Sequence, residues 1–479
     1  MQIAKECLSE QPAEDIMNRY KNIILCIACF AVFLEALDIA IMNLALPLIQ
    51  QYFHLPTESI QWLQTIYVLL YGGFLIIGGK LTDTWGKKTV FLTGATLFLI
   101  TSIGAGFSTS FNSLLAFRAI QGLGAALLMP SAMAIITNTF PAPEERGKAL
   151  GIFSSFAAIG SGCGLSLGGI IASYLGWQWI FFINVPIIAS CLIFAFIHIP
   201  SDTKDKKVQK PDIISGFILS ACIIAISYFI HALPHLVNRP LQVLALLISC
   251  SVGIICFIKR AYKHPTPLIN FQLLKGSYTK VGNQMIFIIG LFFLTYLLIL
   301  SFYLQDILHF SAAKAGLLLF PFSVGSAMVS KFLLPSLLKR LAVIKTAIIG
   351  MLLMFFGALF LAIGIGYDLF AFIIFSVACV MGAGMAVSIP SLTVMALQQI
   401  PVNYHGTASG VNTTAYFFGS GIGLSILSLL MQLPLVLPTL TYQLLAALFI
   451  LLSFTIFAIV YLLVKNDRIK KLHKIHQQI

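Results

Sequence analysis

Long apolar segments recur along the whole chain, and this repetition constrains the fold more than any other feature. A helix needs about 18 or more largely apolar residues to cross a lipid bilayer. Between charged clusters and Gly, Pro or Asn breaks, the 479 residues contain fourteen such segments. We therefore expect an all-α membrane protein with spans at 22–49, 59–79, 89–108, 113–138, 148–173, 179–199, 213–233, 241–259, 279–304, 312–335, 343–365, 370–398, 405–430 and 439–464.

The composition leaves almost no residues for a soluble domain. Hydrophobic residues make up 59% of the chain and charged residues 9%, whereas an average soluble protein has about 25% charged residues. Function is therefore expected within the bilayer. An even number of spans also places both termini on the same side of the membrane.

The basic residues lie mostly on one side of this predicted topology. With a cytoplasmic N-terminus, 25 of the 29 Lys and Arg residues fall in cytoplasmic segments, as the positive-inside rule requires. The net charge of +13 therefore reflects membrane orientation, and we expect no nucleic-acid partner. We expect a multi-pass protein of the cell inner (cytoplasmic) membrane, surrounded by lipid, with both termini in the cytoplasm.

Few ionisable residues lie within the spans, where a charge is expensive and marks a candidate functional site. The first span carries Glu35 and Asp38 on one helix face, and the fourth carries Arg118. At 1.5 Å per residue, Asp38 lies roughly 22 Å along the first helix, and Arg118 reaches a similar depth. Two interpretations stay open, a static ion pair and a site that loads and releases a proton. Asp306, near the outer end of the ninth span, is a further candidate acid.

The loop after the second span has the sequence GKLTDTWGKK, from Gly79 to Lys88. Gly79 and Gly86 suit a tight turn in which two helices approach closely. Asp83 can interact with a helix N-terminus or a basic partner. Lys87 and Lys88 place the loop on the cytoplasmic side of the membrane. The pattern resembles the cytoplasmic loop motif of the major facilitator superfamily, and implies a conformational switch loop. The position after Asp83, usually basic in that family, is a threonine here.

Two further motifs resemble those of the fourteen-helix drug:proton antiporters in this superfamily. The stretch LDIAIMNLALP, from Leu37 to Pro47, looks like their first-helix motif. The stretch RAIQGLGAA, which begins at Arg118, matches their fourth-helix motif, in which the arginine is associated with proton coupling. The resemblance therefore implies a proton-coupling role for Asp38, Glu35 and Arg118.

The fifth span is rich in glycines at the spacing of the antiporter motif of the same branch. Small residues four apart also permit close helix contact in a membrane, which is either tight packing or a flexing seam. Leu165 stands where that motif has proline. The glycines of this helix-packing motif are Gly151, Gly160, Gly164, Gly168 and Gly169.

The resemblance runs along most of the chain and implies the major facilitator fold, with two six-helix bundles and two inserted helices. Polar, lysine-rich stretches mark the boundaries between the units. We expect a cytoplasmic N-terminal arm at 1–21, an N-terminal six-helix bundle at 22–199, cytoplasmic linkers flanking two extra helices at 200–277, a C-terminal six-helix bundle at 278–464 and a basic cytoplasmic tail at 465–479.

By resemblance, the chain is a proton-coupled secondary active exporter of small lipophilic or cationic compounds that works by alternating access. The proton is the coupling ion, and no cofactor or metal is expected. The alternatives are a dedicated exporter of one endogenous metabolite, such as a siderophore or peptide, and a non-transporting membrane receptor. We expect no enzyme, because HExxH, P-loop and GxSxG motifs are lacking. The resemblance also allows for a periplasmic adaptor protein as a partner.

Overall fold

The structure, a computed structural model, describes residues 2–201, 212–233, 239–264, 267–269, 276–400, 405–432 and 439–476. These residues form helices, turns and loops, and within them no strand is present. Fourteen helices in this described part of the chain are long and apolar enough to cross a membrane. The predicted all-helical membrane fold is therefore confirmed.

The first group of helices precedes the linker after residue 201. Within it, Gly86 connects two helices with a φ of 95°, a left-handed conformation that favours glycine. The side chain of Ser110 caps the next helix by accepting a hydrogen bond from the backbone of Ser113. The helices are α1 (Gln2–Phe53), α2 (Thr57–Ile60), α3 (Trp62–Trp85), α4 (Lys87–Gly106), α5 (Phe111–Thr139), α6 (Pro143–Tyr174), α7 (Trp179–Phe182) and α8 (Asn184–His198).

The remaining helices are an inserted pair and a second group. The inserted pair is α9 (Ile213–Ala232) and α10 (Pro240–Lys263). Three helices of the second group contain π-helical turns, at Tyr303–Ile307, Val329–Leu333 and Ala378–Gly384. The helices of this group are α11 (Ser277–Phe302), α12 (Ala312–Met328), α13 (Leu334–Arg340), α14 (Val343–Gly366), α15 (Phe370–Val377), α16 (Met385–Leu397), α17 (His405–Met431) and α18 (Leu440–His476).

Both terminal helices extend beyond the predicted spans. Helix α1 begins at Gln2, within the expected arm, and α18 continues to His476, within the expected tail. Residues such as Ala, Glu, Lys and Leu favour a helix even in water, so a helix does not need to end where the apolar segment ends. Hydropathy therefore located the spans and not the helix ends.

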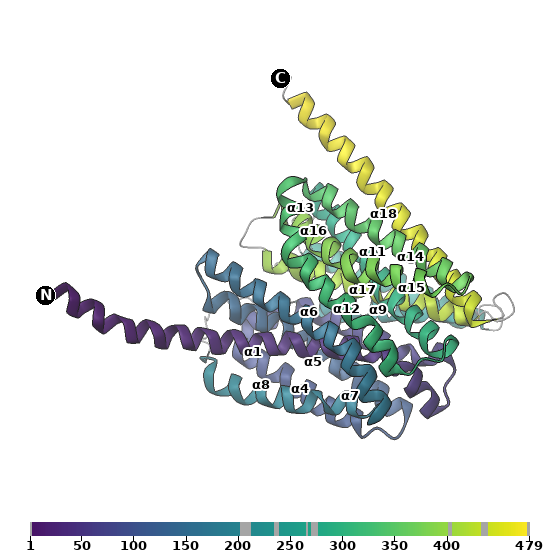
Figure 1. The fold of residues 1–479 in the computed structure, drawn as a ribbon, viewed down its shortest axis with the longest axis horizontal. Helices are drawn as coiled ribbons and strands as arrows, with labels where there is room; N and C mark the ends of the chain where they lie inside the picture. Colours follow the sequence, from purple (N-terminus) through teal and green to yellow (C-terminus); the bar gives the residue numbers. More distant parts are fainter. Residues whose placement is uncertain are drawn as a thin grey trace.

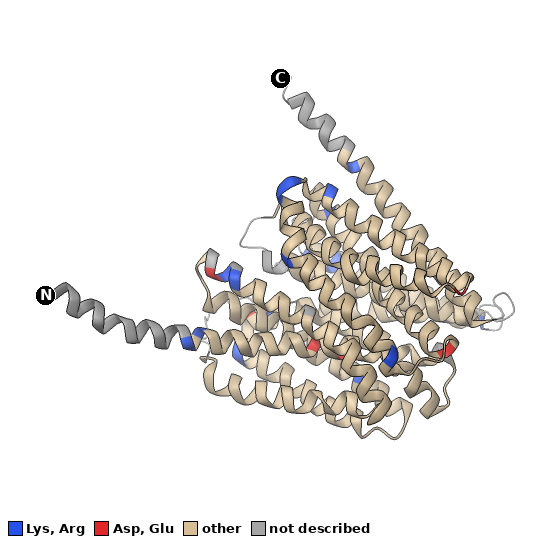
Figure 2. Cartoon of the chain, in the orientation of Figure 1, with Lys and Arg blue, Asp and Glu red and all other residues tan. Residues whose placement is uncertain are grey.

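The two groups of helices form two bundles that meet at one end and diverge toward the end where both chain termini lie (Figure 1). We call these the first bundle, α1 to α8, and the second bundle, α11 to α18. Lys and Arg residues gather at the diverging end (Figure 2). The largest cluster of buried apolar side chains draws from both bundles, and a smaller one lies within the second bundle.

Two seams join the bundles, and they differ. At the seam between α3 and α17, the Thr414 hydroxyl donates to the Gly72 carbonyl, and Tyr71 packs on Phe417 with ring centroids 4.3 Å apart. Helix α9 packs against both of these helices, with Gly73 close to Ser220. At the seam between α6 and α12, no inserted helix takes a comparable position among the described residues.

Candidate functional site

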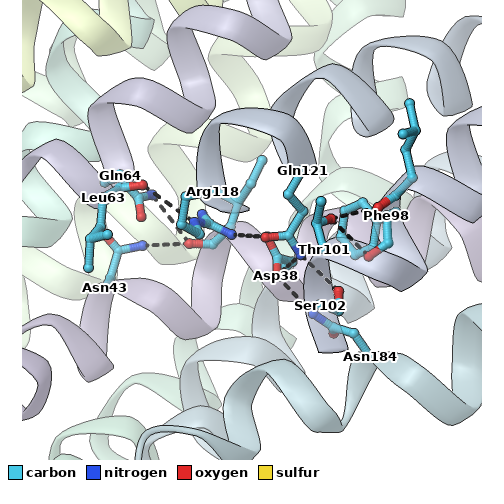
Figure 3. Close-up of polar contacts among 12 residues, drawn as sticks. Asp38, Asn43, Leu63, Gln64, Phe98, Thr101, Ser102, Arg118, Gln121 and Asn184 are labelled. Carbon is cyan, nitrogen blue, oxygen red and sulfur yellow. Dashed lines mark hydrogen bonds and ion pairs between the residues drawn. The ribbon is translucent and has the colours of Figure 1, made fainter. Parts of the chain in front are cut away.

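An ion pair between α1 and α5 forms the centre of the candidate site. Arg118 donates from Nη1 to Oδ2 of Asp38 at 2.7 Å. Both side chains are buried, with exposed fractions of 0% and 1%. Figure 3 shows the two groups meeting between the helices of the first bundle. The depth estimate from sequence therefore placed these two residues at levels that allow contact, and the structure brings them together.

Three neutral side chains complete this network. Gln121 accepts a hydrogen bond from Arg118 at 2.8 Å and donates to Asp38 at 3.2 Å and to Ser102 at 3.0 Å. Asn184, at the start of α8, donates to Asp38 at 2.8 Å. The network therefore joins α1, α4, α5 and α8. Sequence reasoning missed these three partners, although buried Gln and Asn in membrane spans are a usable signal.

The guanidinium of Arg118 has further neighbours from α3. Its Nε donates to the Leu63 carbonyl at 3.4 Å, and its central carbon lies 4.2 Å from the centre of the Tyr67 ring. This cation–π geometry helps to stabilise the buried charge. The second terminal nitrogen, Nη2, has no hydrogen-bond partner among the described residues.

The chemistry of the network follows from its donors. The Asp38 carboxylate accepts hydrogen bonds from Arg118, Gln121 and Asn184, an arrangement that suits the ionised form. A proton placed on Asp38 needs an acceptor, and the three groups that face the carboxylate present donors instead.

Glu35 lies one turn from Asp38 and has a different environment. Its side chain is buried, with an exposed fraction of 7%, and among the described residues no Lys or Arg nitrogen lies within 4.0 Å of it. Its hydrogen-bonding neighbour is Tyr71 of α3, and Tyr416 of α17 also lies in its electrostatic environment. The structure thus pairs Arg118 with Asp38 and directs Glu35 toward the seam between the bundles.

The predicted switch-loop residues lie at the diverging end. Asp83 is exposed in the last turn of α3, and Lys80 and Lys87 are the cations that act on its carboxylate. Lys88 donates to the Phe196 carbonyl of α8 at 2.7 Å, which holds the start of α4 against α8. A Cβ at Gly79 would meet only Pro130, at 3.9 Å.

The glycines of α6 face different neighbours. Gly160, Gly164 and Gly168 lie against α1, where an added Cβ would clash with Phe33, Leu37 and Ile41 respectively. Gly169 lies against the Ala312 carbonyl of α12, across the seam between the bundles. Gly151 has open space around it, with nothing within 4 Å of an added Cβ.

Asp306 lies apart from the described network. It is part of the π-helical turn after α11 and is half-buried. His309 contributes to the electrostatic environment of its carboxyl group. Among the described residues, Arg118 forms its ion pair with Asp38 and has none with Asp306.

Comparison with known proteins decides the family. The family model of the Major Facilitator Superfamily matches residues 28–424. The chain belongs to the major facilitator superfamily. It is 27% identical over 413 residues to the multidrug resistance protein Stp of Mycobacterium tuberculosis, covering 86% of this chain and 76% of that protein. It is also 31% identical to the puromycin resistance protein pur8 of Streptomyces alboniger, covering 67% of this chain and 64% of that protein.

Solved structures confirm the fold of this facilitator. A POT family transporter in complex with a thioalcohol-conjugated peptide superposes with a TM-score of 0.67 at 16% identity, covering 92% of this chain and 96% of the other. At that identity the likeness concerns the fold alone. The predicted family is thus confirmed, and the two relatives above are named as resistance proteins.

Proposed function

We propose that this facilitator is a proton-coupled antiporter that exports small lipophilic or cationic compounds. Membership of the superfamily and the resistance proteins among its relatives support export. The observation that carries the proton coupling is the buried ion pair between Asp38 and Arg118, with the carboxylate held by two further donors.

In this proposal the proton and Arg118 compete for the same carboxylate. When Asp38 is protonated, its bond to Arg118 weakens and the guanidinium is free to turn toward other acceptors. When Asp38 releases the proton, the ion pair of this structure forms again. Because the network joins four helices of the first bundle, the change reaches the packing of the whole bundle.

Glu35 supplies the attraction for cationic substrates. It is buried without a cation partner among the described residues, and Tyr71, Tyr416 and Phe417 lie in its neighbourhood at the seam. An acid beside aromatic rings attracts a lipophilic cation by charge and by cation–π contact. The substrate would therefore bind where both bundles contribute, which is what alternating access needs.

The same proposal covers orientation, partners and the coupling ion. The basic residues at the diverging end support a cytoplasmic location for both termini in a cell inner membrane. In that orientation the bundles are open toward the cytoplasm and closed outside. The proton is the coupling ion and needs no cofactor. A periplasmic adaptor protein, the switch role of Asp83 and the coupling role of Asp306 stay predictions.

Transport in proteoliposomes tests the proposal. The purified protein is reconstituted, a pH gradient is imposed, and uptake of ethidium is followed with the unmodified chain and with Asp38→Asn and Arg118→Ala. We expect uphill accumulation in the unmodified protein only. Accumulation that ignores the pH gradient, or that survives both substitutions, contradicts the proposal. Deletion of the gene separates broad from dedicated export, because loss of resistance to several unrelated cationic dyes supports the former.

A further inference from the structure

The backbone carbonyl of Asn43 in α1 receives its hydrogen bond from the second bundle. In a regular helix this carbonyl would accept from the N–H four residues later, but that residue is Pro47, which has no N–H. The Ser301 hydroxyl of α11 donates to the Asn43 carbonyl instead, at 2.6 Å. Ser301 accepts in turn from the Gln305 side chain at 2.9 Å. Because a hydroxyl has one proton to donate, this arrangement leaves the Ser301 proton for Asn43.

The contact between Ser301 and Asn43 lies close to the buried ion pair. Asn43 follows Asp38 by five residues in α1, toward the end where the bundles meet (Figure 1). That separation is about 7.5 Å along the helix axis. In an alternating-access cycle the joined end parts when the site opens to the other side of the membrane. The bond from Ser301 to Asn43 therefore belongs to the state in which the joined end is closed.

The side chains of Asn43 and Gln64 hold two buried acceptors that are unpaired. Their amide nitrogens donate to one carbonyl, that of Ile39, at 3.1 and 3.4 Å. Their oxygens, Asn43 Oδ1 and Gln64 Oε1, have no hydrogen-bond partner in the described part of the chain. Buried polar atoms without a partner are rare, and each requires an explanation. We call these two oxygens the amide site.

Arg118 has an unpaired donor next to the amide site. Its Nη2 is buried and has no partner within the described ranges, and its Nε donates to the carbonyl of Leu63, the residue before Gln64. Figure 3 shows Asn43 and Gln64 on one side of the guanidinium and Asp38 on the other. The guanidinium therefore lies between the carboxylate that it binds and two amide oxygens that lack a donor.

A second position for the guanidinium is needed once Asp38 takes up a proton. The carboxyl group is then neutral, while Arg118 keeps its charge and must be hydrogen-bonded to stay buried. The other titratable groups near Asp38 are Glu35, which is directed toward Tyr71, and Tyr67. The groups that α4 and α8 contribute to the network are neutral. The amide oxygens are acceptors that a guanidinium can use without a counter-ion.

We propose that the amide site is the second binding position of the Arg118 guanidinium, occupied when Asp38 is protonated, and that Ser301 controls its availability. While Ser301 holds the Asn43 carbonyl, the Asn43 side chain stays bonded to Ile39. Parting of the joined end releases Asn43, and its oxygen then accepts from the guanidinium. The proton stays on the carboxyl group, and no other covalent bond changes. This inference rests on the proposed proton coupling.

The protonation of Asp38 itself tests the amide site. The infrared C=O band of protonated carboxyl groups is recorded against pH in the reconstituted full chain, and the component that is lost in Asp38→Asn belongs to Asp38. We expect Asn43→Leu and Gln64→Leu each to raise the proton concentration for half-protonation about tenfold, because the protonated state loses a hydrogen bond to a charged group. Gln61→Leu is the control and should change it less than twofold. Gln61 is also buried with an unpaired oxygen, but its nitrogen contacts Met431 of α17.

Ser301→Ala should act in the opposite direction. The substitution removes a bond of the closed joined end, so the amide site becomes available more easily. We expect half-protonation of Asp38 at about fivefold lower proton concentration. Ser420→Ala is the matched control and should leave the titration unchanged, because Ser420 also donates to a carbonyl of a neighbouring helix, that of Gly290, but within the second bundle.

The possible failures are distinguishable. If Asp38 titrates but Asn43→Leu and Gln64→Leu shift it no more than Gln61→Leu does, the amide site is overturned and the proposed coupling stands. If Ser301→Ala leaves the titration unchanged or shifts it in the same direction as Asn43→Leu, the control by Ser301 is overturned. If the Asp38 band is missing at every pH, the amide site fails together with the proposed coupling. Gln64→Leu decides the test if Asn43→Leu does not fold.

Discussion

The two bundles divide charge and backbone irregularity between them. The first bundle buries Glu35, Asp38 and Arg118, and its described helices contain no π-helical turn. Within the described residues of the second bundle, no buried Asp, Glu, Lys or Arg is present, and three π-helical turns interrupt its helices. Such turns are often found at functional sites. If the protein works as proposed, we expect proton binding to act on the first bundle and backbone movement to occur in the second.

The substitution Asp38→Asn is expected to have the largest effect on export and on thermal stability. The substitution leaves Arg118 buried without its counter-ion, a change that costs about 3–5 kcal/mol in buried pairs. We expect loss of proton-driven export and a lower Tm. The double variant Asp38→Asn/Arg118→Gln removes both charges, and should recover Tm without recovering export. If it recovers export, the pair is only structural.

Glu35→Gln separates the two acids of α1. Because Glu35 faces Tyr71 and the seam, and has no cation partner among the described residues, we expect weaker binding of cationic substrates with coupling retained. The expected rise in half-saturating concentration is about tenfold, or about 1.4 kcal/mol. A neutral lipophilic substrate should be affected little. An equal loss for neutral and cationic substrates would mean that Glu35 acts in coupling instead.

Asp38 and Glu35 show how much of the site could be predicted from the sequence. Segment length predicted all fourteen spans, because the bilayer imposes one length on every spanning helix. The helical rise of about 1.5 Å per residue also placed Asp38 and Arg118 at a similar depth in the membrane. It could not assign direction around the helix axis, so Glu35 was grouped with Asp38 although their side chains have different neighbours. The contacts of Gln121 and Asn184 depend on packing between helices, which periodicity alone does not specify.

The π-helical turns were beyond prediction from sequence for a related reason. Nothing in the stretch from Ala378 to Gly384 distinguishes a π-helical turn from an ordinary apolar helix with glycines.

Gly382→Ala tests the second bundle. The nearest atom to an added Cβ, in Phe322, is 3.9 Å away, so the methyl group fits. Alanine favours a regular helix over glycine by about 1 kcal/mol, and if the turn must flex we expect turnover to fall about fivefold with unchanged substrate binding. Gly325→Ala, outside the π-helical turns and also without a clash, is the matched control. If both substitutions lower turnover equally, the π-helical turn has no special role in transport.

The smallest effect is expected from the ion pair that holds the inserted helices. Arg260 donates to Asp212 at 2.9 Å, just outside the span of α9. Burial raises the pKa of the Asp212 carboxyl, but hydrogen bonds from Ser215 and Arg260 outweigh it, and the pKa lies below its ordinary value. The pair therefore stabilises the fold above the unfolded pKa of about 3.9 and stops doing so as pH falls through the lower folded-state pKa.

Arg260→Ala measures that contribution. We expect a loss of roughly 0.5–1 kcal/mol at pH 7, seen as a Tm lower by a few degrees, with proton-driven export nearly unchanged. The Tm difference from the unmodified protein should shrink as the pH is lowered below 4. A difference that persists at low pH would mean that Arg260 acts through packing rather than through its charge.

The most direct test of the central claim is the proton movement itself. Proteoliposomes with a pH-sensitive dye inside and no initial pH gradient are given an outward ethidium gradient, and internal pH is followed. We predict that efflux of the cation drives protons inward with the unmodified protein, and that Asp38→Asn abolishes this acidification. Ethidium efflux without acidification, or equal acidification with Asp38→Asn, would contradict the account.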